Sequence, residues 1–152
     1  MLRLEGELDR PLAVTSSDLA GLDAKYQLDV NQVDPKRHGA AVRLAGLLEL
    51  VGVRPNARFL TVHADADDFH ASVPLPPLLE RAVLIYRLAG GPLPVSRGGP
   101  FRLLIPDCAA CQTDEIDECA NVKFVDRIEL SAEKGLDNRP HNEAEHEALH
   151  RR

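Results

Sequence analysis

Tryptophan is absent from this sequence, and aromatic residues make up only 4% of its 152 residues. Proteins that bind single-stranded nucleic acid stack the bases on aromatic side chains, so the composition argues against that class. An excess of positive charge is missing too, because 24 acidic residues outnumber 18 lysines and arginines and give a net charge of −6. We therefore expect neither a nucleic-acid partner nor an anionic membrane surface as a partner.

Long apolar runs are also lacking, because charged residues such as Glu49, Arg81 and Arg87 interrupt the longest ones. No membrane-spanning segment is therefore predicted. The first residues alternate between apolar and charged side chains and do not form the apolar core of a secretion signal, so a cytoplasmic location is expected. The three cysteines are an odd number and are clustered, which is not typical of a secreted disulfide framework.

Short segments of alternating hydrophobicity predict most of the secondary structure. Strands are expected over residues 2–8, 26–30, 58–64, 69–75, 83–90, 101–106 and 122–131. Apolar residues at helical spacing predict one clear helix over residues 42–51, closed by Gly52. Ser16 and Ser17 are candidate N-caps for a short helix, and residues 76–82 predict one helical turn at most. These elements indicate a strand-rich α+β domain with mixed sheets.

Two units are predicted along the chain. Residues 1–131 form the domain, with a cysteine-containing insert at 107–120. Residues 132–152 form a polar C-terminal tail, expected to be partly helical because it is rich in helix-forming residues but has almost no apolar face.

The stretch Gly90–Pro106 reads GGPLPVSRGGPFRLLIP and is unusually rich in glycine and proline. One interpretation is a tight turn, with Arg102 and Lys123 as solvated strand residues. The other is a ligand loop, in which glycine lets backbone N–H groups approach a flat polar ligand and proline fixes the approach. The residues themselves leave both interpretations open.

Four segments in this order carry a resemblance to a known family. They are LRLEGELDRPLAVTSSDLAGL, GAAVRLAGLLELVGVRPNARFLTVHADADDFHASVPL, GGPLPVSRGGPFRLLIP and NVKFVDRIEL. Together they cover about residues 2–131 and resemble the molybdopterin-binding domain of the sulfite oxidase family. The resemblance implies that family's fold and a pterin cofactor, a small anionic ligand, held at the Gly-Gly-Pro loop. Arg102 matches the arginine that follows this motif and Lys123 matches a lysine in the family's closing strand, so both are expected to direct positive charge toward the pterin and its phosphate. The cofactor-binding residues implied by the resemblance are Arg97, Gly98, Gly99, Pro100, Arg102 and Lys123.

The sequence departs from the family pattern at the metal. The family's cysteine thiolate, which ligates molybdenum, is expected at the end of the second strand, where Val30 or a neighbour stands here. Asp29 or Asp34 are alternative oxygen ligands. Because molybdenum is held by soft sulfur donors, oxygen-atom transfer of the sulfite oxidase kind lacks one of its ligands. The expected function is thus a molybdopterin-binding, oxidoreductase-like domain, with no catalytic residue assigned.

The cysteine segment CAACQTDEIDEC supports a separate hypothesis of a structural zinc site. A C-x2-C pair, a third cysteine and one histidine of the tail would supply four tetrahedral ligands. Free thiols and a local disulfide are the alternatives. The candidate zinc ligands are Cys108, Cys111, Cys119, His141, His146 and His150. On this hypothesis the chain is a non-catalytic binding module whose tail contacts a protein partner.

A last candidate is the segment HADADDFH, in which His63 and His70 flank an acidic link. It could hold a cation, but a solvated hairpin end is the favoured interpretation because charged runs are usually surface.

Overall fold

The computed structural model describes residues 1–107, 116–117 and 120–139. The first half of this part contains β1 (Leu2–Gly6), β2 (Leu12–Val14), α1 (Ser16–Ala20), η1 (Ala24–Tyr26), β3 (Gln27–Asp29), η2 (Val30–Gln32), β4 (Ala40–Arg43) and α2 (Leu44–Val51). The second half contains β5 (Phe59–Ala64), η3 (Asp65–Asp67), β6 (Phe69–Pro74), η4 (Pro76–Leu78), β7 (Val83–Leu88), β8 (Gly91–Pro92), η5 (Val95–Arg97), β9 (Arg102–Leu104) and β10 (Arg127–Ser131).

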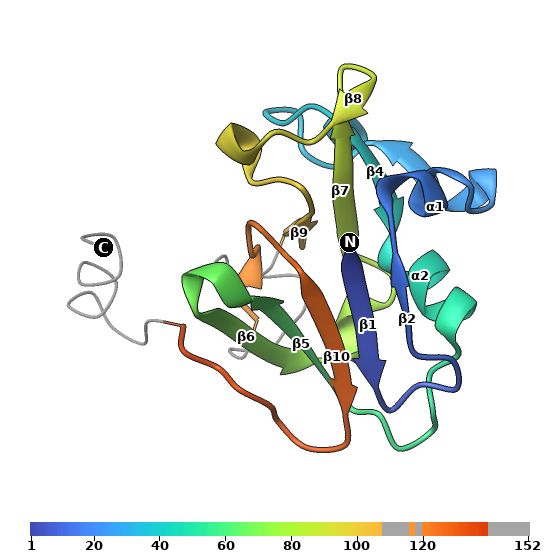
Figure 1. Ribbon diagram of the computed structural model, residues 1–152, viewed down its shortest axis with the longest axis vertical. Helices are drawn as coiled ribbons and strands as arrows, with labels where there is room; N and C mark the ends of the chain where they lie inside the picture. The colour runs from blue at the N-terminus through green and yellow to red at the C-terminus, as the bar shows by residue number, and fades with distance from the viewer. Residues whose placement is uncertain (108–115, 118–119, 140–152) are drawn as a thin grey trace.

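The strands form two sheets (Figure 1). The first has the order β2-β1-β10-β5-β6 and is mixed, because β1 and β10 run parallel while the other neighbours are antiparallel. The second has the order β3-β4-β7-β8, and β9 also pairs with β7. The predicted α+β class with mixed sheets is confirmed. The strands β2, β4 and β8 were not predicted: β2 and β8 are too short to show an alternating pattern, and the residues of β4 were assigned to the loop and the helix that follows it.

Both helices are short, and only α1 begins with a side-chain N-cap. Thr15, not the predicted Ser16 or Ser17, is the N-cap of α1, and with Asp18 it forms a reciprocal capping box. The predicted apolar helix is α2, which starts at Leu44 because the preceding residues belong to β4. Within the described part of the chain, no helix is long and apolar enough to cross a membrane.

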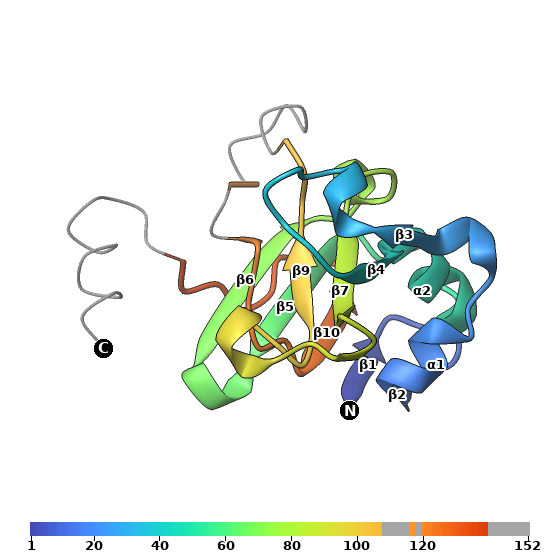
Figure 2. The same cartoon turned by 90° about the horizontal axis from the view of Figure 1, so that it is seen from above.

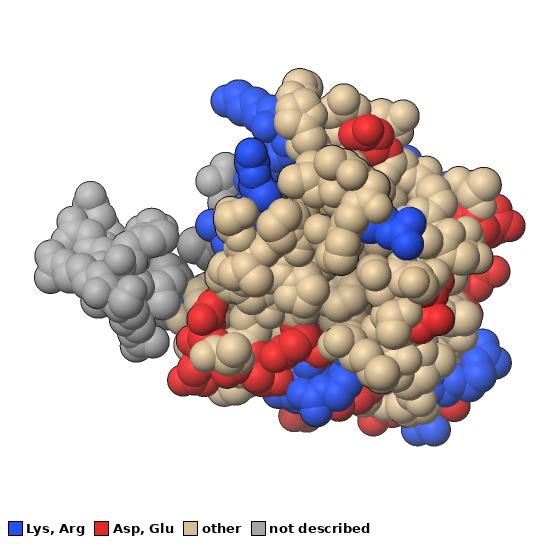
Figure 3. All heavy atoms as spheres, turned by 45° about the horizontal axis from the view of Figure 1, so that its top comes forward, with Lys and Arg blue, Asp and Glu red and all other residues tan. Residues whose placement is uncertain are grey.

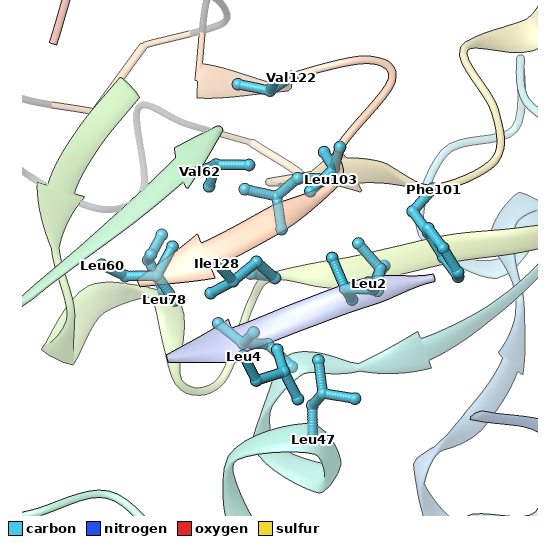
Figure 4. Packing of buried hydrophobic residues seen from close by; sticks show 14 of the residues in the cluster. Leu2, Leu4, Leu47, Leu60, Val62, Leu78, Phe101, Leu103, Val122 and Ile128 are labelled. Carbon is cyan, nitrogen blue, oxygen red and sulfur yellow. The ribbon is translucent and has the colours of Figure 1, made fainter. Parts of the chain in front are cut away.

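The main core lies between the first sheet, α2 and β9 (Figure 4). Leu2 and Leu4 of β1, Leu47 of α2, Leu103 of β9 and Ile128 of β10 all belong to it and are almost completely buried. The alternation of β1 predicted one buried face, and this is confirmed. A smaller cluster, with Leu28, Val30, Ala41, Val83, Ile85, Leu93 and Leu104, packs on the other side of the second sheet. Burial of these side chains is the main source of stability.

The last strand is shorter than predicted. Alternation suggested a strand over residues 122–131, whereas β10 begins at Arg127. The preceding residues turn away from the sheet because Phe124 has a φ of +58° and its N–H donates to the carbonyl oxygen of Gly98 at 2.8 Å. This turn brings Lys123 next to the loop before β9.

Residues 132–139 lie along β6, the outer strand of the first sheet (Figure 1). The backbone N–H of His70 donates to the side-chain oxygen of Asn138 at 2.8 Å, and Asn138 N–H donates back to the His70 carbonyl at 3.0 Å. Asp137 and Arg139 form an ion pair at 2.7 Å with side chains only 6% and 5% exposed. The segment thereby covers backbone groups that an edge strand would leave open.

We expect Arg139→Met to lower the free energy of unfolding by about 3 kcal/mol, because the buried carboxylate of Asp137 then keeps only the more distant Lys134, at 3.9 Å, as a cationic partner. Urea denaturation followed by circular dichroism measures the change. Lys134→Met is the control: its side chain is 46% exposed, so a change within about 0.5 kcal/mol is expected. Equal effects of the two substitutions would show that the buried pair does not hold this segment.

Candidate anion-binding site

The Gly-Gly-Pro loop runs from β8 through η5 to β9, which lies beside β7 (Figure 2). Gly98 and Gly99 are buried, whereas Pro94 and Pro100 on either side are exposed. The N–H of Gly98 donates to the carbonyl oxygen of Val95 at 3.0 Å, and the N–H of Gly99 donates to the carbonyl oxygen of Pro94 at 2.9 Å. Both N–H groups are therefore already used inside the loop. That these N–H groups reach a ligand stays a prediction, and what the structure shows is that neither position carries a side chain.

Two cationic side chains meet at Gly98. A Cβ atom placed on Gly98, whose φ is +91°, would lie 3.0 Å from Cδ of Arg102 and 3.1 Å from Cγ of Lys123. Arg102 comes from β9 and Lys123 from the turn before β10, so the fold brings together residues well separated in the sequence. The alternative, in which they are unrelated solvated residues, is not supported for Arg102, because it is only partly exposed.

The guanidinium group of Arg102 is poorly satisfied. Its Nε atom is buried and has no hydrogen-bond partner among the described residues. Its Nη1 reaches only the carbonyl oxygen of Arg97, at 3.5 Å. Burial, and then the nearby positive charge of Arg37, lower the pKa of Arg102 below its usual value. A buried donor without an acceptor is uncommon, and this one calls for an acceptor that the described residues do not provide, such as a water molecule or a bound ion.

Positive charge gathers around this loop. Arg37, in the loop before β4, forms an ion pair with Asp34 at 3.0 Å, and its positive charge still lowers the pKa of Arg102. Arg97 and Lys123 are exposed and form no ion pair within the part of the chain that the structure describes. On the face shown in Figure 3, basic side chains gather at the upper left without acidic neighbours, whereas both signs are mixed along the lower edge. An anion would therefore find a favourable local potential despite the negative net charge.

Val30 stands close to where the family pattern places its cysteine. It follows β3 directly, is fully buried, and packs in the smaller core cluster. The alternative oxygen ligands are engaged locally: Asp29 accepts from the N–H of Asn31, and Asp34 binds Arg37. No cysteine occurs in the sequence before Cys108.

The predicted zinc ligands lie outside the described residues. They are Cys108, Cys111, Cys119, His141, His146 and His150. Their role stays a prediction.

The sequence did not indicate that Arg37 belongs to this site, and it did not predict that His63 and His70 are buried. Arg37 sits in a polar loop with no recognisable spacing to the Gly-Gly-Pro motif, so no sequence signal linked it to Arg102. His63 and His70 were interpreted as a solvated hairpin end, but both are buried. Their position in the two antiparallel strands, directly opposite each other, was the signal that could have paired them.

Comparison with known proteins identifies the family. The model of the oxidoreductase molybdopterin binding domain matches residues 39–138, so the chain belongs to this family. A solved structure, the sulfane dehydrogenase SoxCD from Paracoccus pantotrophus, matches with a TM-score of 0.64 and 23% identity, which shows a shared fold. The match covers 88% of this chain but only 38% of that one, so the chain spans about two fifths of its length. No curated protein sequence matches.

We expect Arg102→Met to raise the free energy of unfolding of the ligand-free protein by about 1 kcal/mol. A buried donor without an acceptor costs about 1–3 kcal/mol, and the substitution also removes repulsion from Arg37. Chemical denaturation measures the difference. Arg81→Met, at an exposed arginine before β7, is the control and should change stability by less than about 0.5 kcal/mol. A destabilised Arg102→Met protein would mean that the guanidinium is satisfied without a ligand.

Proposed function

We propose that this chain binds the anionic pterin cofactor of its family at Gly98, Arg102 and Lys123. The observation that supports the proposal most is the buried Nε of Arg102, which has no acceptor among the described residues and belongs to a side chain packed, with Lys123, against the bare main chain of Gly98. Such a donor matches a phosphate or a pterin carbonyl, both of which offer oxygen acceptors.

Each residue has a distinct task in this proposal. Arg102 offers a planar fork of donors to a phosphate, and Lys123 adds a compact charge that moves on a flexible stem. Gly98 keeps the main chain bare between them, because any side chain there would be pressed against both cations. Arg37, whose charge acts on Arg102, and the exposed Arg97 next to Gly98 in the chain strengthen the positive potential.

Bound molybdopterin would supply sulfur donors for molybdenum, and the metal would supply oxygen-atom transfer. The donor set of this chain fits the pterin anion better than it fits the metal, because a valine packed in the core offers no ligand atom near the end of β3. We therefore propose cofactor binding as the function of this chain, without a thiolate from this part of the fold. The zinc-stabilised interaction module depends on residues beyond the described part of the chain, and it stays an alternative hypothesis.

The proposal predicts that Arg102→Ala together with Lys123→Ala abolishes cofactor retention. The full chain is purified from cells that make molybdopterin, the pterin is released and oxidised, and its fluorescence gives the amount bound per chain. We expect the double variant to retain at least about 10-fold less pterin than the wild type, since each charge-assisted hydrogen bond contributes about 1.5–3 kcal/mol.

The matched control is Arg58→Ala together with Arg81→Ala, which removes the same charge at two exposed positions. It should keep wild-type pterin content. Equal pterin in both double variants, or none in the wild type under conditions that load other family members, would overturn the proposal. Molybdenum counted on the same samples shows whether the metal accompanies the pterin.

A further inference from the structure

The second group of unusual side chains lies at the tip of the β5–β6 hairpin. His63 of β5 and His70 of β6 stand directly opposite each other in the sheet. They are only 2% and 4% exposed, and their Nδ1 atoms are 2.7 Å apart. Buried imidazoles in such close contact need a defined arrangement of protons, which their other neighbours reveal.

Both outer nitrogens face carboxylates. Nε2 of His63 lies 3.0 Å from Oε1 of Glu129, and Nε2 of His70 lies 2.9 Å from Oδ1 of Asp68. An ionised carboxylate oxygen only accepts, so each Nε2 carries a hydrogen and donates it. In the neutral rings this leaves a lone pair on both Nδ1 atoms, and these lone pairs point at each other. The contact is stable only when a cation, either a proton or a metal ion, lies between them.

A third ligand atom is close by. The nearest ligand atoms of His63, His70 and Asp65 all lie within 4.8 Å of one another. The hydrogen bonds of Arg127 to Asp65, at 3.0 and 3.1 Å, lower the pKa of this carboxyl to about 2, so it is ionised at any physiological pH.

Acidic groups outnumber basic ones around the pair. The carboxylates linked by hydrogen bonds or ion pairs to this cluster are those of Glu5, Asp65, Asp68, Asp126 and Glu129, and the guanidinium groups are those of Arg3 and Arg127. This balance leaves negative charge that favours a cation.

We propose that His63, His70 and Asp65 bind a divalent transition-metal ion that takes nitrogen and oxygen ligands, such as Zn²⁺. In metal sites a ligating histidine commonly donates its other N–H to a carboxylate, and here Glu129 and Asp68 provide both of these contacts. Zinc–nitrogen bonds of about 2.0–2.1 Å at a tetrahedral angle need the nitrogens about 3.3 Å apart, so the pair would open by about half an ångström. Asp65 completes a His2Asp set, with water in the fourth position.

The site is separate from the candidate anion-binding site but connected to it by backbone hydrogen bonds. At one end of a short segment the N–H of Phe124 donates to the carbonyl oxygen of Gly98 at 2.8 Å. At the other end the N–H of Asp126 donates to the carbonyl oxygen of His63 at 3.0 Å. The carboxylate of Asp126 also accepts the N–H of Asp65 at 3.2 Å. A metal at the hairpin would therefore stabilise the segment that carries the turn next to Lys123.

The test is titration of the metal-free full chain with Zn²⁺, followed by calorimetry, with the bound metal counted by elemental analysis. We expect about one zinc ion per chain at this site. His63→Gln together with His70→Gln should weaken its binding by at least about 100-fold, and Glu129→Ala by about 10–100-fold. His38→Gln, at an exposed histidine before β4, should leave binding unchanged.

A combined variant separates this site from the other predicted zinc ligands. It carries Cys108→Ser, Cys111→Ser, Cys119→Ser, His141→Gln, His146→Gln and His150→Gln, and it should keep the zinc ion bound at the hairpin. The proposal would be overturned if the combined variant bound no zinc while the double variant His63→Gln and His70→Gln bound as much zinc as the wild type.

Nitrogen-15 spectra of the histidine rings keep the test decisive even where a variant fails to fold. In the wild-type protein, zinc should shift the Nδ1 resonances of His63 and His70 and leave that of His38 in place. Unchanged Nδ1 resonances at saturating zinc would show that the pair holds only a shared proton, and the metal site would be wrong.

Discussion

The bare main chain at Gly98 and Gly99 is the constraint on which the candidate anion-binding site depends. A side chain on Gly99 would collide with the carbonyl oxygen of Leu93, so the loop packs against its own start. At Gly98 the missing side chain leaves Arg102 and Lys123 next to the backbone, and the Gly98 carbonyl accepts the N–H of Phe124. The loop before β9 and the turn before β10 are thereby fixed to each other. Two cations from different segments are thereby held close together, with no acidic partner for either among the residues that the structure describes.

Charge is distributed very unevenly over this small protein. The net charge of −6 describes the whole chain, yet the surroundings of Arg102 are positive and the surroundings of His63 are negative. Since the interaction between exposed charges is screened over about 8 Å in physiological salt, each region responds to its own neighbours more than to the net charge. The composition disfavours a polyanionic macromolecule as a partner, but it carries no information about a small anion at one loop.

How much the sequence predicts depends on the distance over which a pattern acts. Alternation, short apolar runs and helical spacing are local patterns, and they predict β1, β5, β6, β7 and α2. Of these, β1 and α2 bury one face, whereas consecutive residues of β5, β6 and β7 are buried. The same rule fails at residues 122–126, where Phe124 adopts a positive φ and the main chain follows the loop of Gly98 rather than the sheet. The convergence of Arg102 and Lys123 was implied only by the family resemblance. The effect of Arg37 on Arg102, and the depth at which His63 and His70 are buried, result from tertiary packing that no spacing in the sequence encodes.

Packing explains Val30 but does not explain Arg102. The valine is explained by packing alone, since it is fully buried among apolar neighbours and a smaller or polar group would leave a cavity or an unpaired atom. The arginine is not explained by packing, since its Nε lacks an acceptor among the described residues and another arginine lies nearby. A side chain that destabilises the ligand-free fold is typical of functional sites, where binding offsets its cost. The proposed anion would thus give Arg102 an acceptor that the described residues do not supply, whereas packing in the core accounts for the valine near the expected position of the metal ligand.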